Sequence, residues 1–78
     1  MIDTELLKKT IEKSGISFKF IAEKIGISRE GLYKKTRGNT EFKASEILTL
    51  QKILRLTDKE RDTIFFAENS EYNSHIIE

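Results

Sequence analysis

Residues 18–38 read FKFIAEKIGISREGLYKKTRG, and this stretch decides the fold. Residues 18–25 repeat apolar side chains at the spacing of a short amphipathic helix, which Gly26 ends because glycine readily adopts a left-handed backbone conformation. A second helix begins after Ser28, whose side chain is a typical N-cap, and it runs to about Arg37. The sequence therefore predicts two consecutive short helices.

The connection between these helices is Gly26-Ile27-Ser28. It is too short for an antiparallel hairpin and is typical of two helices that cross at ~90–120°. Ala22 is small where the helices approach each other, and Ile27 and Leu32 are predicted to point into the core. This stretch therefore predicts a helix-turn-helix.

Three further helices are predicted around this pair. One spans about residues 4–14, and another spans about residues 44–56 after a loop at residues 39–42. The fifth follows Thr57, which forms a capping box with Glu60. No repeat or linker divides these elements.

We therefore predict one all-α, compact five-helix domain at residues 1–68. From residue 69 onward the chain is polar and has no cap or stop signal, although it ends in two isoleucines. Chain ends of this kind fray when nothing ties them down. Residues 69–78 are therefore predicted to be a flexible tail.

The basic and acidic residues are distributed unevenly. The whole chain has 14 basic and 13 acidic side chains, with a net charge of +1. Residues 1–43 hold ten basic and six acidic side chains, whereas residues 44–78 hold four and seven, so the two parts carry +4 and −3. This distribution indicates a face for a polyanion in the first part. With counts this small, chance is the alternative explanation.

Several classes of protein are excluded by what the chain lacks. It has no Cys and a single His, His75, so a disulfide scaffold, a thiol enzyme and a metal site are not expected. It offers no Ser/His/Asp set and no glycine-rich phosphate loop, so we expect no enzyme, no cofactor and no small-molecule substrate. Its apolar runs are too short for a membrane span or a signal peptide, and we expect a cytoplasmic protein.

The arrangement resembles the lambda-repressor-like helix-turn-helix domain of the phage Cro and repressor type. The matching pattern is Ile21-Ala22-x-x-x-Gly26-Ile27-Ser28-x-x-x-Leu32, closing at Gly38. Residues 38–57 and the Ile-Phe-Phe at residues 64–66 extend the resemblance to small regulators from phages and prophages of low-GC Gram-positive bacteria. It covers roughly residues 4–67. It implies a lambda-repressor-like fold and a sequence-specific DNA-binding transcriptional regulator, of the Cro-like repressor kind.

Two positions depart from the family pattern. The family usually has Gln where Phe18 begins the second helix, so the contact that this Gln makes near DNA is in doubt here. The family usually has an apolar residue where Lys35 stands, late in the third helix. Either that helix ends early or Lys35 turns outward.

The resemblance makes the third helix the recognition helix, whose N-terminal residues meet base edges in the major groove. The residues at the reading positions are Ser28, Arg29, Glu30, Tyr33 and Lys34. Arg29 can make a bidentate contact to guanine that is worth ~1–3 kcal/mol of discrimination, and Glu30 can accept a hydrogen bond from cytosine. Two alternatives remain at this point. Glu30 and Lys34 pair on a solvated helix face, or Tyr33 lies at the edge of the core.

Phosphate contacts position such a domain without reading sequence. Ser17 offers a hydroxyl at the start of the second helix, and basic or polar side chains surround the third. The phosphate candidates are Ser17, Lys19, Lys35, Arg37, Asn39, Thr40 and Lys43. The alternative for each lysine is an ordinary solvated surface.

Operators for domains of this kind are usually read by dimers, with half-sites ~34 Å apart, so we expect a homodimer on DNA. The candidates for the dimer interface are Phe65, Phe66, Ile76 and Ile77. Residues 64, 65 and 66 span about 200° of a helix, so at least one should point out of the core. The alternative is that all three pack inward.

A protein-binding helix-turn-helix module, such as an anti-repressor or antitoxin, is the alternative function. A DNA reader keeps the outer face of the third helix basic and polar, whereas a protein binder would make it apolar. That face reads Arg29, Glu30, Tyr33, Lys34 and Arg37. It favours a double-stranded DNA operator as the partner.

Overall fold

The computed structural model describes residues 2–67, and within this range the chain is all-helical, with no strand. The five helices are α1 (Thr4–Ser14), α2 (Phe18–Ile25), α3 (Arg29–Thr36), α4 (Ala44–Leu54) and α5 (Asp58–Phe65). The predicted all-α class and the five helices are confirmed. None of the described helices is long and apolar enough to cross a membrane.

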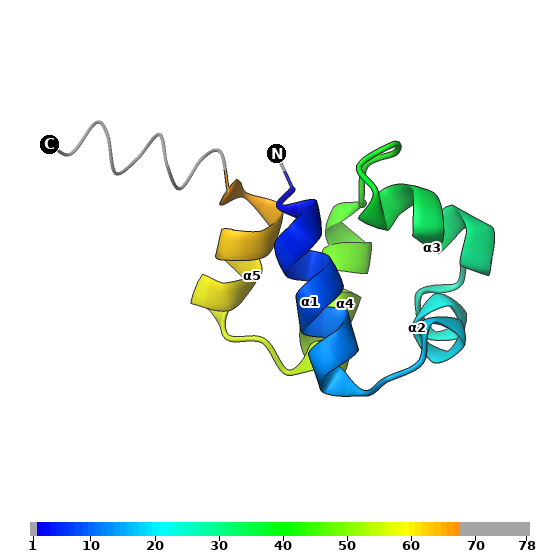
Figure 1. Cartoon of the computed structure of the whole chain (residues 1–78), viewed down its shortest axis with the longest axis horizontal. Helices are drawn as coiled ribbons and strands as arrows, with labels where there is room; N and C mark the ends of the chain where they lie inside the picture. The colour runs from blue at the N-terminus through cyan, green and yellow to red at the C-terminus, as the bar shows by residue number, and fades with distance from the viewer. Residues whose placement is uncertain (1, 68–78) are drawn as a thin grey trace, which may run out of the picture.

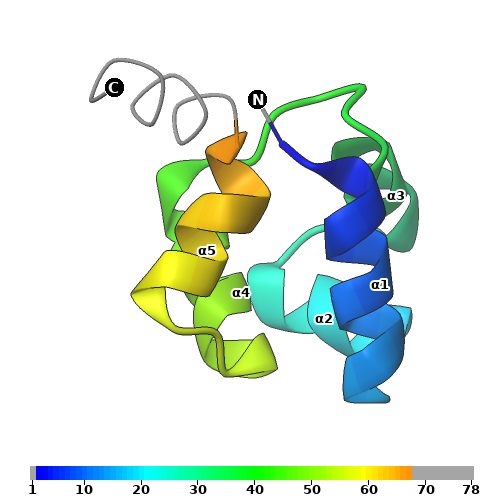
Figure 2. The ribbon, with the colours of Figure 1, turned by 60° about the vertical axis from the view of Figure 1, so that its left-hand side comes forward.

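The helices are arranged around a central pair formed by α1 and α4. Figure 1 shows α2 and α3 on one side of this pair and α5 on the other. Both central helices contact α5, while α1 also contacts α3 and α4 also contacts α2. The turned view in Figure 2 keeps α3 and α5 apart. The helix pair predicted to bind DNA and the C-terminal helix are therefore held by opposite sides of one scaffold.

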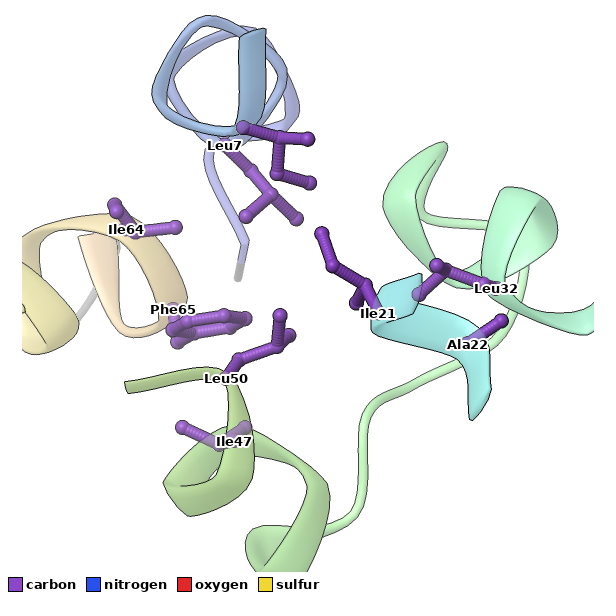
Figure 3. Close-up of a cluster of buried hydrophobic side chains, with 9 residues drawn as sticks. Leu7, Ile21, Ala22, Leu32, Ile47, Leu50, Ile64 and Phe65 are labelled. Carbon is purple, nitrogen blue, oxygen red and sulfur yellow. The ribbon is translucent and has the colours of Figure 1, made fainter. Parts of the chain in front are cut away.

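The core receives one fully buried side chain from each of the first four helices. These residues are Leu7, Ile21, Leu32 and Leu50. Figure 3 shows that they gather in one cluster with Ile64 and Phe65 of α5. Full burial of a leucine or isoleucine stabilises a fold by about 1.5–3 kcal/mol, so this cluster fixes the positions of all five helices together.

Side-chain caps set the beginnings of four helices. Asp3 Oδ1 accepts a hydrogen bond from the Leu6 N–H at 3.0 Å, and Ser17, Ser28 and Thr57 cap α2, α3 and α5 in the same way. The predicted capping box of Thr57 and Glu60 is present. The Asp3 N–H also donates to the Ile64 carbonyl at 2.7 Å, which ties the start of α1 to α5.

Two helices end earlier than predicted. The fourth was expected to reach Leu56, but α4 ends at Leu54 because Arg55 adopts a left-handed conformation with φ 57°. The Leu56 N–H then turns back to the Gln51 carbonyl at 2.9 Å. At the end of α3, Arg37 is the C-cap and lies just outside the helix.

The candidates for a dimer interface separate at the end of α5. The prediction that at least one residue of the Ile64–Phe66 stretch points outward is confirmed, because Phe66 is 38% exposed. Phe65 as an exposed interface residue was wrong: it is only 5% exposed, and its ring packs edge-on against Phe42, 5.4 Å between centroids. Phe42, from the segment before α4, gives the second aromatic ring a place in the core. Ile76, Ile77 and the tail at residues 69–78 lie outside the described residues.

Candidate nucleic-acid interface

The candidate interface begins at the three-residue connection between α2 and α3. Gly26 has φ 89°, and the N–H groups of Gly26 and Ile27 both donate to the Ala22 carbonyl, at 2.9 and 3.0 Å. Ser28 is extended, and its Oγ accepts the Gly31 N–H at 3.0 Å. Figure 1 shows α2 nearly end-on while α3 lies across the view, so the two helices cross. The predicted crossing of two helices joined by a short turn is therefore present.

One side of α3 is buried and the opposite side is polar. Leu32 is fully buried and is the one residue of α3 in the core cluster. All five candidates for base contacts are exposed. They are Ser28, Arg29, Glu30, Tyr33 and Lys34. The structure therefore brings these candidates together on the surface at and after the N-terminus of α3.

The two alternatives for this face can be compared with the geometry. Tyr33 is 51% exposed, so its ring is a surface feature and not an edge of the core. Within residues 2–67, no ion pair joins Glu30 to Lys34, although both lie on the exposed part of the same helix. Neither alternative removes these side chains from the outer surface.

Lys35 does not belong to the exposed face. Its Nζ lies 2.9 Å from Glu46 Oε1 and also donates to the Glu41 carbonyl at 3.0 Å, and its side chain is only 14% exposed. Both expected explanations for a lysine at this position were wrong, because the helix continues through Lys35 and the side chain turns inward. A carboxylate on α4 neutralises the lysine where an apolar residue would otherwise pack. Lys35 is therefore not available as a phosphate contact in this arrangement.

Glu46 joins the end of α3 to the start of α4. Its Oε1 accepts hydrogen bonds from the Lys35 ammonium and from the Lys43 N–H, the latter at 2.8 Å. Burial raises the pKa of the Glu46 carboxyl, but these hydrogen bonds and the charges of the two lysines outweigh it and hold the pKa below its usual value. The carboxylate is thus ionised at neutral pH, and it positions the C-terminal end of α3.

The other phosphate candidates are all exposed. They are Ser17, Lys19, Arg37, Asn39, Thr40 and Lys43. Ser17 caps α2 by accepting the Phe20 N–H at 3.1 Å, which leaves its hydroxyl hydrogen for an acceptor outside the protein. After α3, the Asn39 N–H donates to the Lys34 carbonyl at 2.9 Å and holds the following loop against the helix.

An aromatic contact across α2 and α3 was not predicted. The Phe18 and Tyr33 rings meet edge to face, with centroids 5.6 Å apart and planes at 88°. The guanidinium of Arg37 lies over the Tyr33 ring, 4.4 Å from its centroid. The signal in the sequence was the departure at Phe18, which had been assigned to the apolar face of the second helix alone.

A groove beside this aromatic contact also brings in residues that the prediction did not include. It has a volume of about 680 Å³ and runs between α1 and the end of α3. Lys8 and Lys9 line it on the α1 side, and Arg37 lines it on the α3 side. The basic surface around α3 therefore extends onto α1.

Within residues 2–67, no cluster of His, Cys, Asp and Glu side chains could hold a metal ion. Comparisons with known proteins add no assignment: no family model, no curated protein and no solved structure matches this chain. The functional argument therefore rests on the surface of α3 and its surroundings.

Proposed function

We propose that this chain is a sequence-specific DNA-binding transcriptional regulator with a lambda-repressor-like fold, of the phage Cro and repressor type. In this proposal α3 enters the major groove of an operator, and the surrounding basic and polar side chains contact phosphates. The observation that carries the proposal is the division of α3 into one buried leucine and an exposed polar face. Such a helix can leave its outer side to another molecule without losing its place in the core.

The chemistry of the exposed face suits base edges and phosphates. Arg29 lies in the first turn of α3, where recognition helices meet base edges. Its guanidinium matches the two acceptors of guanine. Lys34, Arg37 and Lys43 add positive charge along the helix and the loop after it, and cationic side chains gain affinity for DNA by releasing counterions.

The proposed operator has two half-sites that are read by a dimer. Half-sites for such domains lie ~34 Å apart, so the pairing surface must lie away from α3. Phe66 supplies exposed apolar area at the end of α5, on the other side of the α1/α4 pair. We propose that it contributes to pairing on DNA.

Selection from a random pool of double-stranded DNA, at two salt concentrations, tests this function directly. We expect enrichment of one two-fold symmetric site, with an affinity that falls as salt rises. Lys19→Ala should weaken all DNA sequences alike and lower the salt slope by about one unit. A pool without enrichment at both salt concentrations would contradict the proposal and favour a protein partner.

A further inference from the structure

A hollow lies at the N-terminal end of the exposed face of α3, on the opposite side of the aromatic pair from the groove along α1. Its volume is about 640 Å³, and it is lined by Phe18, Ser28, Arg29, Glu30 and Tyr33. Two aromatic rings supply an apolar wall, and three polar or charged side chains surround it. The hollow thus combines an apolar surface with hydrogen-bonding groups at the position where a recognition helix meets bases.

The aromatic wall is held in place before any ligand arrives. Phe18 is half-buried and packs against the core, so its ring is anchored by the fold. Tyr33 is exposed, but it is held between the Phe18 ring at 5.6 Å and the Arg37 guanidinium at 4.4 Å. A side chain fixed in this way loses little conformational freedom on binding.

The chemistry of the hollow matches one feature of the major groove. Among the base pairs of unmodified DNA, thymine alone presents a methyl group there, and apolar side chains recognise it by contact. Arg29 and Glu30, on the same rim, offer a donor and an acceptor to a neighbouring base edge. A hollow lined only with polar groups would have no reason to prefer the methyl group.

We infer that Phe18 and Tyr33 form a receptor for the C5-methyl group of a pyrimidine, normally thymine, in each half-site of the operator. The inference rests on the proposed function and deepens it, because it assigns a specificity-determining role to Phe18. It also gives the departure from the family's usual Gln at this position a consequence: an apolar contact replaces a hydrogen bond.

The test uses the whole chain and the operator obtained from the selection. Each thymine is replaced in turn by deoxyuridine, which lacks only the methyl group, and the dissociation constant is measured. We expect one position in each half-site at which the replacement weakens binding about fourfold, the value of one buried methyl group. Placing 5-methylcytosine at a cytosine of the other positions should have no comparable effect.

Three variants separate the methyl contact from other roles of the rings. Phe18→Ala should remove the discrimination between thymine and deoxyuridine, while Phe20→Ala, which changes an exposed aromatic residue of the same helix outside the hollow, should keep it. Tyr33→Phe should also keep it, because the ring and not the hydroxyl makes the contact. If Phe18→Ala fails to fold, as circular dichroism would reveal, Tyr33→Ala takes its place because Tyr33 is exposed.

The outcomes are distinguishable. An enriched operator at which no thymine-to-deoxyuridine replacement changes the dissociation constant would overturn the inference and leave the proposed function standing. Loss of affinity in Tyr33→Phe with unchanged methyl discrimination in the alanine variants would assign the tyrosine to a phosphate, and would overturn it too. No enriched DNA at all would overturn both.

Discussion

The chain contains two helix pairs with the same local design and different surfaces. In each pair a helix ends at a left-handed residue, an apolar residue follows, and a hydroxyl side chain caps the next helix: Gly26-Ile27-Ser28 joins α2 to α3, and Arg55-Leu56-Thr57 joins α4 to α5. In each connection the apolar residue donates its N–H to a carbonyl five residues earlier. The backbone of the turn therefore does not distinguish the two pairs.

The side chains beyond the turn do distinguish them. α3 begins with Arg29-Glu30 and has one residue in the buried core, whereas α5 begins with Asp58-Lys59 and has two, Ile64 and Phe65. The segment 18–37 holds six basic and two acidic side chains, while the segment 44–66 holds four of each. The comparison teaches that helix-turn-helix geometry alone assigns no function, and that surface charge and depth of burial must decide.

The second pair is also fastened by a polar network. The Gln51 side chain donates to Asp58 Oδ1 at 2.8 Å and to the Leu56 carbonyl at 3.1 Å, and Arg61 donates to Gln51 Oε1 at 3.1 Å. These bonds lock the end of α4 to the beginning of α5. Among the described residues, the first pair has no equivalent side-chain network across its turn, and its outer face is left to solvent.

Charge reversal in the first turn of each pair should have the largest effect. Arg29→Glu removes a proposed guanine contact and adds repulsion from phosphates, so specific binding to the selected operator should fall by ~100-fold or more. Lys59→Glu makes the same change in the first turn of α5 and should leave binding nearly unchanged. Titration by fluorescence anisotropy, with thermal melting of both variants, measures this. Equal binding by Arg29→Glu and the parent would show that α3 is not the reading helix.

Removal of the charge at Glu46 should have the next largest effect. Glu46→Gln leaves the Lys35 ammonium without its carboxylate and should lower the free energy of unfolding by about 2 kcal/mol at pH 7. Because the folded-state pKa of Glu46 is lowered, this contribution is present above the usual value of 4.5 and is lost as pH falls through the lower folded-state value. The parent and the variant should therefore converge at acidic pH.

Denaturant unfolding at pH 7 and in acid, with the exposed Glu41→Gln as the matched control, checks the role of Glu46. The control should change stability little at either pH. A loss of stability in Glu46→Gln that persists unchanged in acid would mean that packing, and not the charge, accounts for it.

Exchange of the left-handed residues of the two turns should have the smallest effect. Gly26→Ala should destabilise the fold by about 1–2 kcal/mol through backbone strain alone, since a Cβ at Gly26 would meet no atom within 4 Å. Arg55→Gly should stabilise it by about 1 kcal/mol, because Arg55 already occupies the left-handed region at φ 57°. Thermal unfolding of both variants measures the difference, and shifts of the same sign would refute the shared design of the turns.

Much of the fold could be predicted because the signals that set it are local. Ser17, Ser28 and Thr57 cap helices whose first turns follow directly in the sequence, so the beginnings of α2, α3 and α5 were correct. The end of α4 was missed because Arg55 takes a conformation that usually indicates glycine. The exposed candidates on α3 followed from the periodicity that buries Leu32.

Other features could not be predicted because they depend on distant residues. Lys35 has its partner eleven positions away on another helix, and nothing near it in the sequence indicates burial. The contact of Phe18 with Tyr33 depends on how α2 and α3 cross. For Phe65 and Phe66, the outcome depends on where the backbone leaves helical geometry, since Phe66 has φ −129° and ψ 39°.

The hydrogen bond from the Asp3 N–H to the Ile64 carbonyl has a kinetic consequence. It joins positions near the two ends of the described chain, so it forms only after the intervening segment has been brought together, and closing a long loop costs entropy that local helix formation does not. The Asp3 amide proton should accordingly exchange with deuterated solvent when α5 detaches from α1. Its rate of exchange would report, at a single resolvable site, how often the last helix leaves the body of the protein.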